Sequence, residues 1–196
     1  MNNTFASSEK RPPDKLADDN EAAWIAKACN DPAAFEPLYL RYHTRLYRYL
    51  RTRLTSDEDA ADMTHQVFLL ALDALPRYQQ RGLPFAAWLF RIAHHAVIDT
   101  RRRQHPTVSW DALPETLQPL AEQDPETQAL QQEALTHLRT WLATLKAEQR
   151  ELLALRFAAG LTVPQIAAVI GKKPEATKKQ ISRLIQSYKE LFSYGH

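Results

Sequence analysis

Residues 152–184, LLALRFAAGLTVPQIAAVIGKKPEATKKQISRL, decide the fold of the C-terminal half of the chain. A leucine-rich helix is predicted to end near Gly160. Thr162 and Gln165 then have the spacing of a capping box, and the short helix that they begin should end at Gly171, a residue suited to a left-handed C-cap. Another helix follows. This order predicts a helix-turn-helix, the arrangement whose second helix lies in the major groove of DNA.

The last predicted helix, residues 174–192, separates into two faces on a helical wheel. The apolar face should pack inward, and its residues are Thr177, Ile181, Leu184, Ile185, Tyr188 and Phe192. The opposite face mixes cations that neutralise phosphates with polar groups that can bond base edges. It contains Lys172, Glu175, Lys179, Ser182, Arg183 and Gln186. The alternative interpretation is a generic helical hairpin whose outer face is only solvated.

Helical periodicity extends over almost the whole chain, and we find no convincing alternating strand, so the sequence predicts an all-α fold. Residues 1–20 are predicted to be a flexible tail, 21–103 a first helical domain and 127–196 a second. Residues 104–126 hold four prolines and no apolar periodicity, which is typical of an interdomain linker. Helices are expected at residues 21–29, 33–54, 57–75, 84–103, 127–144, 147–158, 162–170 and 174–192.

The composition excludes several classes of protein. With 196 residues and 22.5 kDa, the chain can bury a core without disulfides. The single cysteine, Cys29, excludes an intramolecular disulfide and a CxxC metal site, and it fits a reducing cytoplasm. Neither GxGxxG nor GxxxxGKS/T occurs, no apolar run approaches the ~20 residues of a membrane span, and the N-terminus resembles no signal peptide. We therefore expect a cytoplasmic protein without membrane span, metal or cofactor.

The net charge is only +2, but the basic residues are clustered. One cluster is the triplet Arg101, Arg102 and Arg103. The other cluster lies near the C-terminus and contains Lys172, Lys173, Lys178, Lys179 and Arg183. Two basic clusters in a nearly neutral chain favour two contacts with one polyanion. The alternative is two solvated helix faces.

The third predicted helix carries acids in its first turn after Ser56, which resembles an N-cap. On a helical wheel, a polar stripe of this helix lies beside large apolar groups. The stripe contains Asp59, Asp62, Gln66 and Asp73, and its flanks are Met63, Leu69 and Leu70. A carboxylate stripe with apolar edges indicates a protein-docking surface rather than a solvated face. Alternatively, the two leucines pack against the first helix.

The loop before the fourth predicted helix combines aromatic, amide and arginine side chains, namely Arg77, Tyr78, Gln79, Gln80 and Arg81. The polar face of that helix adds Arg91, His94, Arg101 and Arg102. Such a combination is typical of single-stranded nucleic-acid binding, in which rings stack on bases and cations neutralise the backbone. Trp88 shares the apolar face of the helix and is expected in the core.

Four stretches, in order along the chain, resemble an extracytoplasmic-function sigma factor of bacterial RNA polymerase. They are AAFEPLYLRYHTRLYRYL (33–50), DAADMTHQVF (59–68), FAAWLFRIAHHAVID (85–99) and GLTVPQIAAVIGKKPEATKKQISRL (160–184). The resemblance implies a four-helix sigma-two domain and a helix-turn-helix sigma-four domain joined by the proline-rich linker. It also implies a transcription initiation factor that binds the clamp and flap regions of core RNA polymerase and directs the enzyme to promoter DNA.

By this resemblance, the sigma-two domain would melt the minus-ten promoter element, and the loop 76–83 would capture an unstacked base. The residues implied at that element are Arg77, Tyr78, Gln79, Gln80, Arg81, Arg91, Arg101 and Arg102. Those implied at the minus-thirty-five element are Lys172, Lys173, Glu175, Thr177, Lys178, Lys179, Ser182 and Arg183. Those implied to bind the polymerase are Asp59, Asp62, Gln66, Leu69 and Leu70.

The predicted docking helix departs from the family pattern, which usually reads close to DAED-hydrophobic-x-QE-x-F. Ala61 and Gln66 stand where the family has glutamates, so fewer carboxylates remain to pair with basic clamp residues. We therefore hypothesise that the unmodified protein binds polymerase weakly and is activated by a Ser/Thr kinase, as in some subgroups, because phosphorylation adds roughly −1.5 to −2 charges. Candidate acceptors are Thr55, Ser56 and Thr64. The alternatives are compensated neutral drift and control by an anti-sigma factor.

Three other classes compete with this interpretation. A stand-alone helix-turn-helix regulator explains the C-terminal half but neither the arginine-aromatic loop nor the docking stripe. A structural helical adaptor predicts no salt-dependent DNA binding. An enzyme fits worst, because no HExxH occurs and the adjacent His94 and His95 point about 100° apart on a helix, too far to share a ligand face. No catalytic residue is therefore assigned.

Overall fold

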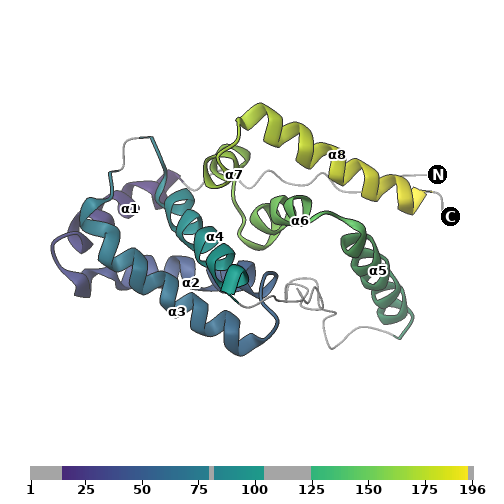
Figure 1. Ribbon diagram of the computed structural model, residues 1–196, viewed down its shortest axis with the longest axis horizontal. Coiled ribbons are helices and arrows are strands. Elements are labelled where there is room, and N and C mark those ends of the chain that lie inside the picture. Colours follow the sequence, from purple (N-terminus) through teal and green to yellow (C-terminus); the bar gives the residue numbers. More distant parts are fainter. Residues whose placement is uncertain (1–14, 80–81, 104–124, 194–196) are drawn as a thin grey trace.

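The structure is a computed structural model that describes residues 15–79, 82–103 and 125–193 (Figure 1). Every regular element in these ranges is a helix, which confirms the predicted all-α fold for the described part of the chain. The helices form two groups, here called the N-terminal and the C-terminal half. The N-terminal half contains α1 (Lys15–Ala28), η1 (Pro32–Phe35), α2 (Glu36–Arg51), α3 (Asp57–Ala74), η2 (Leu75–Arg77) and α4 (Phe85–Arg103).

The C-terminal half contains α5 (Pro125–Thr144), α6 (Ala147–Leu153), the π-helical turn η4 (Ala154–Ala158), α7 (Val163–Ile170) and α8 (Pro174–Ser193). Most boundaries agree with the predicted ranges to within a few residues. The exception is α1, which begins at Lys15, so the last part of the predicted flexible tail is helical. Of the predicted linker, residues 104–124 lie outside the described residues.

The N-terminal half is held by the apolar faces of α2, α3 and α4. Tyr49, Phe85 and Phe90 are among its largest fully buried side chains. The start of α3 follows the predicted capping, because the Ser56 hydroxyl accepts a hydrogen bond from the Asp59 backbone N–H at 3.0 Å. Acidic residues fill the first turn of this helix, where the helix dipole favours them.

The C-terminal half contains the predicted helix-turn-helix, formed by α7 and α8. The Gln165 side chain accepts a hydrogen bond from the Thr162 backbone N–H at 2.9 Å, as one half of a capping box does. Gly171 ends α7 in the left-handed conformation, with φ of 69°. Before the motif, the helix that starts as α6 widens by one residue at η4, where the Ala159 N–H bonds the Ala154 carbonyl at 3.0 Å.

The two halves pack against each other in the described structure. Figure 1 shows α7 beside α4, and these helices are in contact, as are α2 and η4. The buried apolar side chains of both halves form one continuous core, in which Leu155, Leu161 and Ile166 are fully buried. The helix-turn-helix therefore has its apolar side covered partly by the N-terminal half.

The left-handed turn at Gly171 generates a stability prediction. Gly171→Ala should lower the free energy of unfolding by about 1 kcal/mol, because a Cβ disfavours this backbone conformation although no atom lies close enough to clash with it. Gly171→Asn should lose less, since asparagine tolerates the left-handed region. Urea denaturation followed by circular dichroism measures both values. Equal stability of the alanine variant and the parent would contradict this account of the turn.

Candidate functional site

The exposed face of α8 and of the turn before it is rich in cations. Most of the residues implied to bind DNA lie on this face with solvent-exposed side chains, namely Lys172, Lys173, Glu175, Lys178, Lys179, Ser182 and Arg183. Five of these seven are basic, so the face combines phosphate-neutralising charge with short polar groups. The opposite side of α8 packs inward through Ile181 and Leu184.

Thr177 corrects the predicted set. Its side chain is fully buried, and its hydroxyl donates to the Lys173 carbonyl at 3.1 Å within the first turn of α8. The prediction that Thr177 contacts DNA is therefore wrong for this structure, whereas the prediction that it packs inward is confirmed. A buried threonine whose hydroxyl bonds the backbone of its own helix is not available to read a base.

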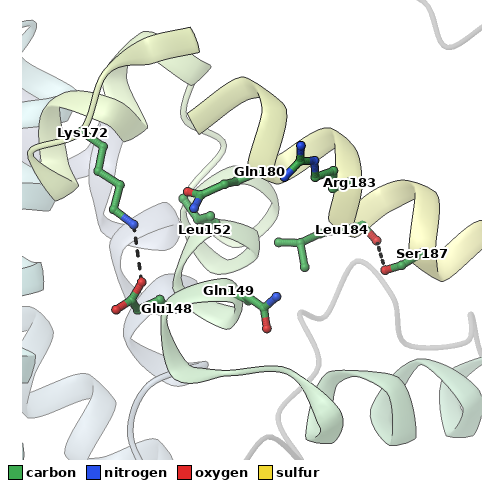
Figure 2. Close-up of a pocket in the computed structure, with 8 residues that line it drawn as sticks. All are labelled: Glu148, Gln149, Leu152, Lys172, Gln180, Arg183, Leu184 and Ser187. Carbon is green, nitrogen blue, oxygen red and sulfur yellow. Dashed lines mark hydrogen bonds and ion pairs between the residues drawn. The ribbon is translucent and has the colours of Figure 1, made fainter. Parts of the chain in front are cut away.

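A pocket lies between the N-terminal end of α6 and the side of α8 that faces it (Figure 2). Its volume is about 360 Å³. Lys172 reaches across it to Glu148, with 3.4 Å between the ammonium nitrogen and the carboxylate oxygen. Gln180 and Arg183 line the pocket from α8, above the apolar floor of Leu152 and Leu184. Gln180 is a polar group beside Arg183 that the sequence analysis did not single out.

The predicted docking stripe is exposed on α3. Asp59, Asp62 and Gln66 are solvent-exposed, and beside them Leu69 is 68% and Leu70 45% exposed. The alternative that both leucines are covered by packing against the first helix is wrong, because both side chains are exposed. Met63, which was expected at the edge of the stripe, is buried and belongs to the core. Two large aliphatic side chains next to carboxylates form a surface with the composition of a protein interface.

The loop after α3 is held at its base by Tyr78. The Tyr78 hydroxyl donates to the Leu83 carbonyl at 2.8 Å, and its ring packs on Trp88 and Phe85, with centroids 4.9 Å and 5.8 Å away. Burial, followed by the nearby charge of Glu21, raises the pKa of Tyr78 to about 12. These contacts make Tyr78 a support of the loop rather than a ring free to stack on a base.

The remaining residues predicted at the loop and on α4 have mixed positions. Arg77, Gln79 and Arg91 are solvent-exposed. Gln80 and Arg81 lie outside the described residues, and Arg101 and Arg102 belong to the last turn of α4, where no side chain is described. Trp88 is half-buried against Phe85, with ring centroids 5.3 Å apart, close to the expected core position.

The three candidate phosphorylation sites differ in accessibility. Thr64 is fully buried and donates to the Ala60 carbonyl at 2.7 Å, so a kinase could not reach it in this fold. The Ser56 hydroxyl is half-buried and bonded both to the backbone N–H and to the carboxylate of Asp59. Thr55 is exposed, and its hydroxyl donates to Asp59 Oδ2 at 3.2 Å. Thr55 is thus the most accessible of the three.

A buried polar cluster, which the sequence analysis missed, joins the two halves around Glu151 of α6. The side chain of Glu151 is almost completely buried. One carboxylate oxygen accepts a hydrogen bond from the Tyr49 hydroxyl at 2.7 Å and lies 2.9 Å from Nδ1 of His94. The other oxygen lies 2.9 Å from the guanidinium of Arg53, which is also buried. We refer to these four residues as the Glu151 cluster.

The cluster keeps Glu151 ionised. Burial alone would raise the pKa of this carboxyl group, but the hydrogen bond from His94, the charge of Arg53 and the hydrogen bond from Tyr49 outweigh it and hold the pKa below its ordinary value. A signal for this cluster was present in the sequence. Glu151 lies directly before Leu152 and Leu153, which are both buried, and a glutamate in such a place needs partners.

Metal-binding clusters and membrane-spanning helices are both absent from the described residues. No group of three histidine, cysteine or acidic side chains in residues 15–79, 82–103 and 125–193 is arranged to hold a metal ion. Within the same ranges, none of the helices has both the length and the apolar character that crossing a membrane requires.

Comparison with known proteins identifies the family. Residues 38–107 match the family model of sigma-70 region 2, and residues 136–186 match that of sigma-70 region 4. The chain is 36% identical over 152 residues to the ECF RNA polymerase sigma factor SigD of Mycobacterium tuberculosis, covering 73% of this chain and 69% of SigD. The chain belongs to the extracytoplasmic-function (ECF) sigma factor family. It is therefore a transcription initiation factor that directs RNA polymerase to promoters, and its partners are core polymerase and promoter DNA.

Other relatives agree with this assignment. The ECF sigma factor ShbA of Streptomyces griseus is 34% identical over 171 residues, covering 82% of this chain and 88% of ShbA. Two solved structures share the fold. CnrH in complex with the cytosolic domain of CnrY has a TM-score of 0.61 at 22% identity, covering 89% of this chain and 97% of that chain. RpoE in complex with the anti-sigma factor NepR from Bartonella quintana has a TM-score of 0.60 at 20% identity, covering 81% and 96%.

The exposed cations of α8 generate a prediction for the holoenzyme of this sigma factor. Lys179→Ala should lower promoter affinity and reduce the slope of log affinity against log salt concentration by about 1, because one fewer phosphate is neutralised. Lys27→Ala, an exposed lysine on α1, is the charge-matched control and should leave the slope unchanged. Filter binding or fluorescence anisotropy over a salt series measures the slope. Identical slopes for Lys179→Ala and the parent would remove Lys179 from the DNA interface.

Proposed function

We propose that this ECF sigma factor binds the polymerase clamp through the exposed stripe on α3 and reads two promoter elements with its two halves. The observation that carries the proposal is the stripe itself, in which Leu69 and Leu70 are exposed beside Asp62 and Gln66. Adjacent exposed leucines beside carboxylates are typical of a surface that becomes buried against a partner protein. In this role the protein acts in the cytoplasm together with the polymerase, whose own active site performs RNA synthesis.

The upstream promoter element is assigned to α8 and the minus-ten element to the loop between α3 and α4. The exposed cations of α8 support the first assignment, because a recognition helix enters the major groove with this kind of face. Exposed Arg77, Gln79 and Arg91 support the second. The Tyr78 contacts support it further, because they fix the ends of a loop that would otherwise lose more conformational entropy on binding.

We also propose that activity is limited by missing negative charge on α3 and restored by phosphorylation at Thr55. Because Ala61 and Gln66 stand where the family has glutamates, the carboxylates in the N-terminal part of the stripe are those of Asp59 and Asp62. A phosphate on Thr55 would add charge at the N-terminal end of α3, where the helix dipole favours anions. The accessibility of Thr55 supports it over buried Thr64. An anti-sigma protein is the second candidate regulator, since RpoE of Bartonella quintana is bound by one.

A pair of added carboxylates tests the missing charge. Ala61→Glu/Gln66→Glu should tighten binding to core RNA polymerase about tenfold over the unmodified protein, because each restored carboxylate gains a basic partner. Gln132→Glu/Ala134→Glu adds the same charge at exposed positions of α5 and should leave the affinity unchanged. Biolayer interferometry with recombinant core enzyme gives both constants. If the parent binds as tightly as the α3 variant, the missing carboxylates do not limit binding and a charge switch is not needed.

Mass spectrometry of the protein purified from its native host tests the phosphorylation site. Absence of phosphate on Thr55 would contradict Thr55 as the acceptor.

The apolar part of the stripe generates a separate prediction. Leu69→Ser should weaken core polymerase binding at least about tenfold, since burial of one leucine contributes about 1.5–3 kcal/mol. Leu40→Ser is a matched control, because Leu40 is 67% exposed on α2 and Leu69 is 68% exposed on α3. The same interferometry measures both variants. Unchanged affinity of Leu69→Ser would place the polymerase interface elsewhere.

A further inference from the structure

The carboxylate of Glu21 on α1 lies inside the N-terminal half and has a defined set of partners. Its side chain is only 12% exposed. One carboxylate oxygen accepts a hydrogen bond from the Tyr42 hydroxyl at 2.6 Å and lies 3.1 Å from Nε of Arg41. Because Tyr42 is buried, its hydroxyl needs an acceptor within the protein. Glu21 supplies that acceptor and so fixes the position of the Tyr42 ring through a contact between α1 and α2.

A series of packed rings leads from Tyr42 to the loop between α3 and α4. The Tyr42 ring packs on Phe85, the first residue of α4, with centroids 5.4 Å apart. Phe85 in turn packs edge-on against Tyr78, with centroids 5.8 Å apart and ring planes at 89°. Tyr78 directly follows η2 and joins the two ends of the loop by donating to the Leu83 carbonyl. Both ends of the loop are thus connected to Glu21 through three aromatic side chains.

A second contact joins α1 to the residues before this loop. Cys29 directly follows α1, and its thiol donates to the Leu75 carbonyl at 3.5 Å. Leu75 begins η2, the turn that leads into the loop. The buried side chains of Ile25 and Ala28 also anchor α1 in the core. Because these contacts do not involve Glu21, removal of the Glu21 carboxylate should loosen the ends of the loop without detaching α1.

The charges around Glu21 favour structural support over contact with DNA. A carboxylate repels phosphate groups, and this one is paired with Arg41. Arg45 lies over the Tyr42 ring, 5.3 Å from its centroid, and also donates to the Ala159 carbonyl at 2.8 Å, just after η4. Burial, followed by the charge of Glu21, raises the pKa of Tyr42 above its ordinary value. The phenol therefore stays protonated and keeps donating to Glu21.

We propose that Glu21 is a positioning residue for promoter opening: by holding Tyr42, it keeps Phe85 and Tyr78 in the arrangement that joins the ends of the loop before DNA binds. This inference rests on the proposed assignment of the minus-ten element to the loop between α3 and α4. A loop whose ends are already fixed loses less conformational entropy when it binds unstacked DNA. Glu21 thus speeds opening without touching DNA. The stripe on α3 and the cations of α8 consist of other residues, so binding to polymerase and to the upstream element should not depend on Glu21.

The test measures promoter binding and promoter opening separately in the holoenzyme. The template is a promoter selected from random duplex DNA by the parent holoenzyme, with 2-aminopurine in its minus-ten element as the reporter of opening. Glu21→Ala removes the acceptor of the Tyr42 hydrogen bond, and we expect opening to become about fivefold slower. The affinities for core polymerase and for the closed promoter complex should stay at the parent values. A parallel loss of these affinities would show that Glu21 only stabilises the fold and would overturn the positioning role.

Three further variants test the route through Tyr42. Glu21→Gln keeps an oxygen that accepts from Tyr42, so it should restore most of the opening rate. Tyr42→Phe removes the donor of the same bond and should slow opening by a similar factor, which keeps the test valid if circular dichroism shows that Glu21→Ala does not fold. The double variant Glu21→Ala/Tyr42→Phe should be no slower than Glu21→Ala, and additive effects would overturn the route. Glu133→Ala is the control, because it removes an exposed carboxylate of α5 and should open the promoter as the parent does.

Arg77, which is exposed at the start of the loop, separates failure of the positioning role from failure of the proposed function. Arg77→Ala should slow opening if the loop binds the minus-ten element. Slow opening by Arg77→Ala, together with parent rates for Glu21→Ala and Tyr42→Phe, would overturn the positioning role alone. Parent rates for all three variants would overturn both that role and the assignment of the loop to the minus-ten element.

Discussion

A buried carboxylate must be compensated, and in this protein the compensation of Glu151 comes from the other half of the molecule. Its partners Tyr49, Arg53 and His94 cannot be replaced by water while the surrounding leucines remain packed. These side-chain contacts join α6 to α2 and α4, and beside them η4 packs on α2 and α7 packs on α4. The apolar core is continuous across the same boundary, so buried apolar side chains join the halves together with the polar cluster.

The same arrangement leaves the interaction surfaces outside. The stripe on α3 and the cations of α8 face solvent, and the apolar contacts between the halves use other faces of the helices. This transcription factor must bind both a protein and DNA. Because its binding surfaces and its core use different side chains, a core residue can be substituted without changing the residues of the binding surfaces. On α3, Val67 and Phe68 face the core, whereas Leu69 and Leu70, the next two residues, lie on the side of the helix that faces solvent.

Much of the fold could be predicted from local patterns, because helix caps and apolar spacing act over a few residues. Ser56 and Gly171 were predicted as caps and are caps in the structure. Thr177 supports the same conclusion, because the helical wheel placed it on the buried face, whereas the family resemblance implied a DNA contact that its burial contradicts. The Glu151 cluster could not be predicted, since its members are far apart in sequence and only the tertiary packing of the halves brings them together.

The π-helical turn at Ala154–Ala158 has a consequence for how related chains should be aligned. Such a turn accommodates one additional residue inside a helix without changing the loops on either side. It also leaves Phe157 62% exposed just before the turn that Arg45 caps. A homologous chain that is one residue shorter here can form an ordinary α-helix, so the gap between the two sequences belongs within this helix and not in the neighbouring loop.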